Sequence, residues 1–178
     1  MLKKALGRPF RVIPPAVDED LPPGLDAPGA VMALAARKAE AVAGTLRAGI
    51  VIGADTLAAA DGCIIGKPKD PEDARAILRR LSRVEHEVWT GLCLIDARSG
   101  MRRTDCERTR VRMRAMSENE ISRYVTGGEA MGKAGAYAIQ ETGDRFVENL
   151  DGSLSNVVGL PVELLRRMLA EFDARDEG

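Results

Sequence analysis

The clearest pattern in the sequence is a short apolar run that ends in two polar residues. Residues 50–52 are all β-branched and Gly53 follows them, which is typical of a buried strand. Asp55 and Thr56 come directly afterwards, so the pattern places a carboxylate and a hydroxyl at the carboxyl end of a strand. Open α/β sheets bind their ligands outside the carboxyl ends of strands. We therefore predict a functional site here, with simple capping of the strand as the alternative for Asp55.

Apolar positions recur at helical spacing in four other segments, each of which begins at a recognisable signal. Asp26 and Asp70 are N-cap candidates with a proline in the first helical turn, and Ser117 with Glu120 forms a capping box. The predicted helices run from Asp26 to about Arg47, over 70–81, over 117–126, and from Pro161 through Phe172.

Most of the remaining segments predict strands, and Asp61-Gly62 between two of them is a strong signal for a two-residue hairpin. Because strands and helices do not alternate strictly, we expect a mixed, twisted sheet rather than a purely parallel one. Helices would flank this sheet in a single α/β domain over residues 1–178. Besides the run at 50–56, the predicted strands are 11–15, 57–60, 63–65, 87–96, 102–114, 137–140 and 145–150.

Composition argues against several classes of function. The net charge is −1 and aromatic residues make up 3%, so neither a strong field nor a base-stacking platform is present to hold nucleic acid or an anionic membrane. Cys63, Cys93 and Cys106 lie far apart without metal-site spacing, as a reducing compartment allows. No apolar run reaches membrane-spanning length and no signal-like segment follows Met1, so we expect a cytoplasmic protein.

Charged side chains gather in loops whose composition a core does not require. Glu19 lies in an acidic loop, Lys67 in a rigid Gly-Lys-Pro-Lys turn and Lys133 in a glycine-rich loop. Lys38 falls on or beside the apolar stripe of a predicted helix, an unusual place unless its ammonium reaches a site. Singly, each loop has a solvated turn as its alternative. Together with Asp55 they are typical of a metal–polyphosphate site, because carboxylates hold a hard cation and lysines neutralise phosphate charge.

The glycine-rich loop does not match GxxxxGK[ST], which excludes a P-loop NTPase. Five blocks in a fixed order instead resemble the Maf family of nucleotide pyrophosphatases, and the resemblance spans about residues 5 to 170. The blocks are Val51-Ile52-Gly53-Ala54-Asp55-Thr56, Gly66-Lys67-Pro68-Lys69, His86-Glu87-Val88 with Thr90-Gly91, Lys133-Ala134-Gly135-Ala136-Tyr137-Ala138-Ile139-Gln140 and Ser155-Asn156-Val157-Val158-Gly159-Leu160-Pro161.

This resemblance implies a fold related to the inosine triphosphatase family, with two lobes and a nucleotide in the cleft between them. It also implies hydrolysis of a nucleoside triphosphate between the α and β phosphates, giving the monophosphate and pyrophosphate. Asp55 matches the family's catalytic carboxylate, the proton acceptor for the attacking water. Glu19 resembles the acidic residue near the divalent metal, Mg²⁺ or Mn²⁺, which Asp55 would share.

The remaining matched positions concern the substrate. Lys38, Lys67 and Lys133 match lysines that face the phosphates. Thr56 and Gln140 resemble the pair that marks the branch specific for dTTP and UTP, and an amide can pair with both the donor and the acceptor on a pyrimidine edge. That branch is thought to remove non-canonical or excess pyrimidine nucleotides.

One family motif is absent from these 178 residues: Ser-x-Ser-Pro-Arg-Arg, which follows the family's first strand and binds the triphosphate. Either the true start lies upstream or the protein lacks this clamp, whose charge-assisted contacts are worth roughly 1.5–3 kcal/mol each. We expect the chain as written to hydrolyse dTTP poorly and a version extended upstream to work.

Other interpretations stay open at this point. One is a catalytically impaired Maf-like regulator of cell division, since family members have been linked to septum formation. A second is a nucleic-acid-binding module built on the arginines at alternate positions of 108–114, for which a solvated edge strand is the commoner explanation. Hydrolysis of modified nucleotides is the nearest neighbouring activity. The sequence does not decide whether the chain forms a homodimer.

Overall fold

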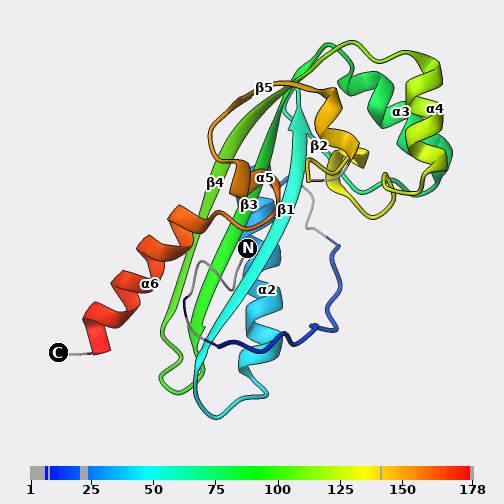
Figure 1. Ribbon diagram of the computed structural model, residues 1–178. Coiled ribbons are helices and arrows are strands. Elements are labelled where there is room, and N and C mark those ends of the chain that lie inside the picture. Colours follow the sequence, from blue (N-terminus) through cyan, green and yellow to red (C-terminus); the bar gives the residue numbers. More distant parts are fainter. Residues whose placement is uncertain (1–6, 8, 21–23, 141, 177–178) are drawn as a thin grey trace.

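One long, twisted antiparallel sheet organises the molecule, as the computed structural model of residues 7, 9–20, 24–140 and 142–176 shows (Figure 1). The strand order is β2-β1-β3-β4-β5, and every neighbouring pair is antiparallel. The prediction of helices around a sheet is confirmed, but the expectation of a mixed sheet is wrong for the described strands. Tight hairpins join β1 to β2 and β3 to β4, and such hairpins pair strands in opposite directions. The strands are β1 Ile50–Ala60, β2 Cys63–Ile65, β3 Glu85–Asp96, β4 Arg102–Met113 and β5 Val147–Asp151.

The helices begin where the local capping signals predicted. The Asp26 carboxylate accepts a hydrogen bond from the Gly29 amide, Asp70 accepts two at the start of its helix, and the Ser117–Glu120 capping box is formed. The first helix ends at Ala43, four residues before the predicted Arg47. A short helix capped by Ser153 was not predicted. The helices are α2 Ala27–Ala43, α3 Pro71–Leu81, α4 Glu118–Thr126, α5 Leu154–Val157 and α6 Val162–Asp176, with 3-10 turns η1 Ala134–Ala136 and η2 Thr142–Phe146.

Helix α2 lies directly on one face of the sheet because two glycines let it come close. A Cβ atom on Gly53 would lie 2.3 Å from the Ala35 carbonyl oxygen, and one on Gly91 would lie 2.4 Å from the Val31 carbonyl oxygen. No side chain fits at either position. The same close contact brings Lys38 of α2 within reach of Asp55 in the middle of β1.

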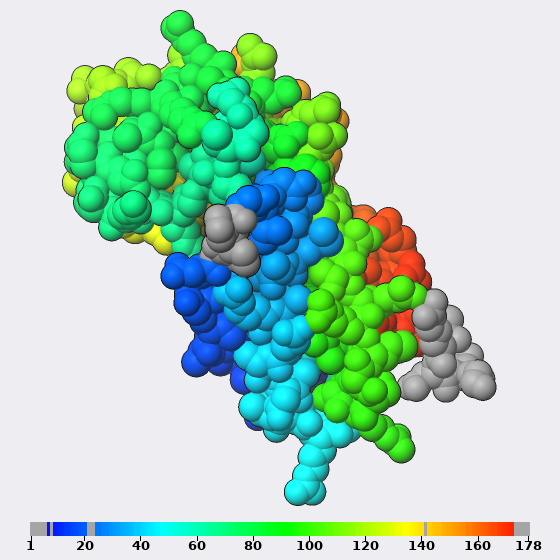
Figure 2. Space-filling view, turned by 180° about the vertical axis from the view of Figure 1, so that it is seen from behind, coloured from blue at the N-terminus to red at the C-terminus, as the bar shows by residue number. Residues whose placement is uncertain are grey.

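The other face of the sheet and its far end carry two separate apolar clusters. Leu92 and Leu94 of β3 pack under α6, opposite α2. At the other end, α3, α4 and η1 pack around Phe146, Leu78 and Ile121 with the ends of β1, β3 and β4. Figure 2 shows the two parts from behind, with a rounded end built around α3 and an elongated body along which α2 runs.

Three predicted strand segments take other conformations. Residues 11–15 are extended but pair with no strand, because Pro14 and Pro15 lack the amide hydrogens that a ladder needs. Residues 137–140 follow η1 as coil and a turn, in which Tyr137 is buried against His86. The strand expected from Arg145 begins only at Val147, after η2.

The edge of β1 determines where a ligand has access. On one side β1 pairs with β3 from Ile50 to Ala59. On the other side β2 pairs only with Ala58, Ala59 and Ala60. Within the described part of the chain, the outer edge of β1 from Ile50 to Leu57 therefore has no strand partner.

Candidate active site

Asp55 lies in the middle of a strand, not at its end. Strand β1 continues to Ala60, and Asp55 is opposite Gly91 of β3. The prediction of a strand terminus is therefore wrong. Asp55 still reaches a cavity, because the edge of β1 next to it is open.

Four charged side chains form a chain that starts at Asp55. The Lys38 ammonium lies 2.5 Å from Asp55 Oδ1 and 2.7 Å from Glu19 Oε1. The Lys67 ammonium lies 2.7 Å from the other Glu19 oxygen, Oε2. Residues from the acidic loop, α2, β1 and the turn after β2 thus meet with alternating charge.

Burial and these contacts shift the titration of three members of the chain. Burial raises the pKa of Asp55, and the hydrogen bond from Lys38 offsets only part of this rise. Burial lowers the pKa of Lys38, but its bonds to Asp55 and Glu19 outweigh that effect, so the net pKa is raised. Glu19 accepts from Lys38 and Lys67, which lowers its pKa to about 2. At neutral pH Lys38 is therefore a firmly held cation beside a carboxylate of unusual basicity.

Arg37, which the sequence analysis did not single out, holds the acidic loop in place. Its Nη1 donates to the carbonyl oxygens of Asp18 at 2.6 Å and Asp20 at 2.9 Å, on either side of Glu19. Arg37 and Lys38 are adjacent on α2, so one turn of helix binds both the backbone and the side chain of this loop. The sequence signal that could have indicated Arg37 is its place next to Lys38, in a basic pair beside the apolar stripe of the helix.

A cavity of about 290 Å³ opens beside Asp55 at the free edge of β1. Its walls come from β1, the turn after β2, the glycine-rich loop and the α5 region. Five of the predicted site residues line it, while Glu19 and Lys38 reach it through Asp55 and Lys67. The five are Asp55, Thr56, Lys67, Lys133 and Gln140.

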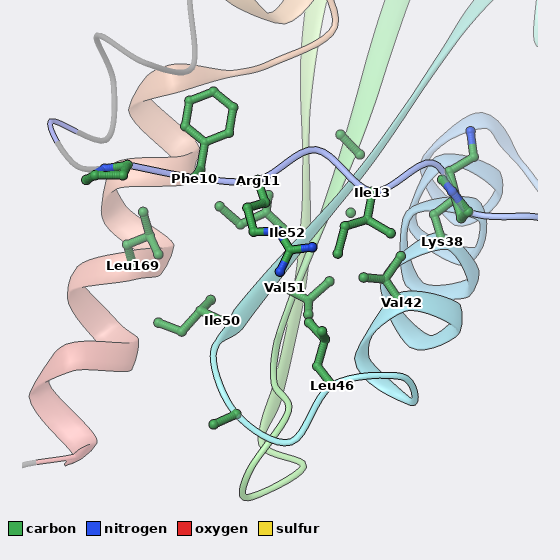
Figure 3. Close-up of a pocket in the computed structure, with 15 residues that line it drawn as sticks. Phe10, Arg11, Ile13, Lys38, Val42, Leu46, Ile50, Val51, Ile52 and Leu169 are labelled. Atoms are coloured by element: carbon green, nitrogen blue, oxygen red, sulfur yellow. The ribbon is translucent and has the colours of Figure 1, made fainter.

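A larger cavity of about 640 Å³ follows the same strand edge further from Asp55. Figure 3 shows the N-terminal segment crossing β1 here, with Phe10 near Leu169 and Lys38 on α2 at the opposite side. Its wall is mainly aliphatic, and Arg11 and Lys38 are the charged residues in it. No carboxylate lines this larger cavity, whereas Asp55 lines the smaller one. We therefore choose the smaller cavity as the candidate active site because of its chemistry.

Thr56 faces the opposite side of the sheet from Asp55, since neighbouring residues of a strand alternate. Its Oγ1 lies 2.9 Å from Thr90 Oγ1 on β3, and Thr90 Oγ1 donates to the Asn156 carbonyl oxygen at 2.9 Å. Thr90 and Asn156 belong to the motif blocks of the sequence, but the sequence assigned them no role. Both are fully buried.

The chemistry of the donor set decides whether a divalent cation fits. Within the described residues, no three His, Cys, Asp or Glu side chains come together as metal ligands. Mg²⁺, however, commonly uses one or two carboxylates and completes its shell with substrate phosphates and water. Glu19 and Asp55 are such a pair, joined through Lys38. The residues therefore fit a cation that arrives with a polyphosphate.

The arginine stripe of β4 is neutralised within the protein. Its members contact carboxylates on β3, β5 and α4, and the second half of β4 pairs with β5, so that half is not a sheet edge. The contacts leave little unbalanced charge for a nucleic acid backbone. The pairs are Arg108–Glu87 at 2.9 Å, Arg110–Asp151 at 3.5 Å, Arg112–Glu148 at 3.2 Å and Arg114–Glu120 at 2.7 Å.

Known proteins match nearly the whole chain in sequence. The family model described as Maf-like protein matches residues 1–172. The chain belongs to the Maf family. This Maf protein is 47% identical over 171 residues to a dTTP/UTP pyrophosphatase of Pelotomaculum thermopropionicum, across 96% of this chain and 90% of the relative. It is 43% identical over 169 residues to a dTTP/UTP pyrophosphatase of Syntrophomonas wolfei, across 95% and 89%. No helix in the described part of the Maf chain is long and apolar enough to cross a bilayer.

Proposed function

We propose that this Maf protein hydrolyses dTTP and UTP to the monophosphate and pyrophosphate. The observation that carries the proposal is the Asp55 carboxylate, buried beside Lys38 and open to a cavity that Lys67, Thr56 and Gln140 also line. The relatives described above are dTTP/UTP pyrophosphatases, and their activity supports the proposal. The nucleotide would lie in the cleft between the elongated body and the rounded end of the molecule.

In the proposed mechanism, Asp55 accepts a proton from the attacking water. Burial raises the pKa of this carboxylate, which makes it a stronger base than an exposed aspartate. Lys38 keeps it oriented through the 2.5 Å contact. Water attack would break the anhydride between the α and β phosphates, releasing pyrophosphate.

The cations of the cleft would stabilise the charge of the triphosphate. Lys67 and Lys133 line the cavity from two different loops, and charge on the leaving pyrophosphate grows as the bond breaks. Glu19 and Asp55 would hold a divalent cation, Mg²⁺ or Mn²⁺, which supplies Lewis-acid polarisation of the phosphates when bound. Thr56 and Gln140 would contact the pyrimidine.

The test is release of pyrophosphate from dTTP and UTP by the purified protein, with and without added Mg²⁺. Asp55→Asn keeps the shape of the side chain and removes the base, so we expect turnover to fall by about 10²–10⁴-fold, the usual range for a general base. Asp61→Asn, in the exposed hairpin at the end of the same strand, is the matched control. Equal rates for Asp55→Asn and wild type would reject the mechanism.

The same assay separates the enzyme from the non-catalytic regulator of cell division. A regulator with this fold would bind nucleotides without releasing pyrophosphate, and Asp55→Asn would leave that binding intact. The proposed reaction uses free nucleotides and the structure has three free thiols, so we place the protein in the cytoplasm.

A further inference from the structure

We propose that Thr90 is a positioning residue that fixes the Thr56 hydroxyl as a hydrogen-bond acceptor toward the cleft. A ligand must then have a hydrogen-bond donor where it meets Thr56. The N3–H group of uracil and thymine is such a donor, whereas the unprotonated N3 of cytosine is an acceptor. This inference rests on the proposed function and adds the physical cause of its base preference.

The argument begins at a carbonyl. The Asn156 carbonyl oxygen can only accept, and it lies 2.9 Å from Thr90 Oγ1. A threonine hydroxyl has one hydrogen, and Thr90 donates it to the Asn156 carbonyl oxygen. At the 2.9 Å contact with Thr56, Thr90 is therefore the acceptor and Thr56 the donor. The hydrogen of Thr56 points away from the cleft, and only its lone pairs remain for a ligand.

The carbonyl that sets this direction is held firmly. The Asn156 side-chain amide donates to the Val88 carbonyl oxygen at 3.0 Å and to Thr109 Oγ1 at 2.9 Å. The same Asn156 carbonyl also accepts from the Gly159 amide at 2.8 Å. Asn156, Thr90 and Thr109 are all fully buried, so water does not compete for these bonds. The hydrogen bonds can therefore run only from Thr56 to Thr90 and from Thr90 to the Asn156 carbonyl.

Gln140 cannot impose this choice alone. It is exposed and lines the cleft from the segment after η1, and a primary amide can present either its oxygen or its NH₂ group to a ligand. Thr56 lies on β1, directly opposite Thr90 in the strand register, and its hydroxyl has no such freedom. We therefore assign the discrimination between uracil and cytosine to the Thr56–Thr90–Asn156 chain. Gln140 can bind the hydrogen-bonding edge of either base.

The test compares kcat/KM for UTP and CTP in wild type, Thr90→Val and Thr90→Ser. Valine keeps the shape of threonine without its hydroxyl, so the Thr56 hydroxyl becomes free to rotate and to donate to cytosine N3. We expect the UTP/CTP ratio to fall by about tenfold, the factor set by one hydrogen bond of ordinary strength, chiefly through a lower KM for CTP. Thr90→Ser restores the hydroxyl and should restore the ratio.

Thr104→Val is the control for replacing a sheet threonine by valine. Thr104 lies opposite Cys93 in the register of β3 and β4, its hydroxyl oxygen is buried, and it does not line the cleft. Thermal unfolding of each variant shows whether it is folded. An unchanged ratio in folded Thr90→Val, or an equal fall in Thr104→Val, would overturn the inference.

A wild-type measurement tests the inference without any substitution. UTP methylated at N3 lacks the donor, whereas UTP methylated at C5 keeps it, so we expect turnover of the first to be lost and of the second to be retained. Similar turnover of both would overturn the inference. If wild type releases no pyrophosphate from any nucleotide, the proposed function fails by itself. In that case, calorimetry of UMP and CMP binding to wild type and Thr90→Val tests the inference. We expect wild type to bind UMP more tightly than CMP and Thr90→Val to lose this preference.

Discussion

Replacing Lys38 by methionine tests the charge chain on which the site is built. The Lys38 side chain is 17% exposed and that of Asp55 8%, so the substitution leaves a nearly buried carboxylate without its cation. Breaking a fully buried pair costs 3–5 kcal/mol and an exposed pair at most about 1 kcal/mol. The Lys38–Asp55 pair lies between these limits, and Glu19 keeps Lys67 as a partner. We expect Lys38→Met to lower the free energy of unfolding by about 2–3 kcal/mol at pH 7.

The pH dependence identifies the cause of this loss. Without Lys38, the pKa of Asp55 rises further above its value in the unfolded chain, so the folded variant binds a proton more tightly than the unfolded one. Its stability relative to wild type therefore recovers as the pH falls through the pKa of Asp55. At high pH, the contribution of Lys38 in wild type is lost as the pH rises through its own raised pKa.

The assay is urea unfolding of wild type, Lys38→Met and Lys69→Met at pH 7 and pH 4.5. Lys69 is an exposed lysine of the turn that contains Lys67, and it does not line the cleft, so its removal controls for general loss of positive charge. An equal loss for the two variants, or a Lys38→Met deficit as large at pH 4.5 as at pH 7, would refute the reasoning.

The remaining predictions concern the proposed catalytic base, the packing of α2 and a buried histidine. Hydrolysis of dTTP should fall on acidification with a midpoint above the ordinary aspartate pKa, because burial raises the pKa of Asp55; a midpoint below that value in a pH–rate profile would contradict it. Gly53→Ala should cost about 3 kcal/mol of unfolding free energy through overpacking against α2, whereas Gly66→Ala, with nothing within 4 Å of its added Cβ, should unfold like wild type in the same urea series. Burial lowers the pKa of His86 to about 4, so NMR titration of this single histidine should give a midpoint near that value, and stability should decline as the pH falls below the ordinary histidine pKa; a midpoint near 6.5 would show that the ring is solvated.

Local signals determined which elements could be predicted from sequence. Asp70 and Ser117 cap their helices through bonds to amides two or three residues away, so the sequence alone contains both partners. The end of β1 was predicted wrongly because Asp55 and Thr56 look like a polar strand terminus. Their partners, Lys38 and Thr90, lie 17 and 34 residues away, and only the tertiary fold shows that a strand can continue through both.

Some residues of the candidate site could likewise be predicted from sequence, and others could not. Lys38 was detectable because a lysine on an apolar stripe conflicts with helix patterning, and the structure gives that lysine a carboxylate on each side. Thr90 and Asn156 gave no such signal, since a buried hydroxyl and amide are ordinary parts of a strand and a short helix. The role proposed for them depends on the register that sets Thr90 opposite Thr56.

Strand β1 explains how one cleft can combine two kinds of chemistry. Asp55 and Thr56 are adjacent and so face opposite sides of the sheet, Asp55 toward the lysine of α2 and Thr56 toward the α5 region. In the interior of a sheet such neighbours would be separated by the strand itself. Because the outer edge of β1 is open from Ile50 to Leu57 in the described chain, one ligand lying along that edge can contact both. In the proposed function, the open edge would thus let a proton acceptor and a base-reading hydroxyl on adjacent residues contact the two ends of a single nucleotide.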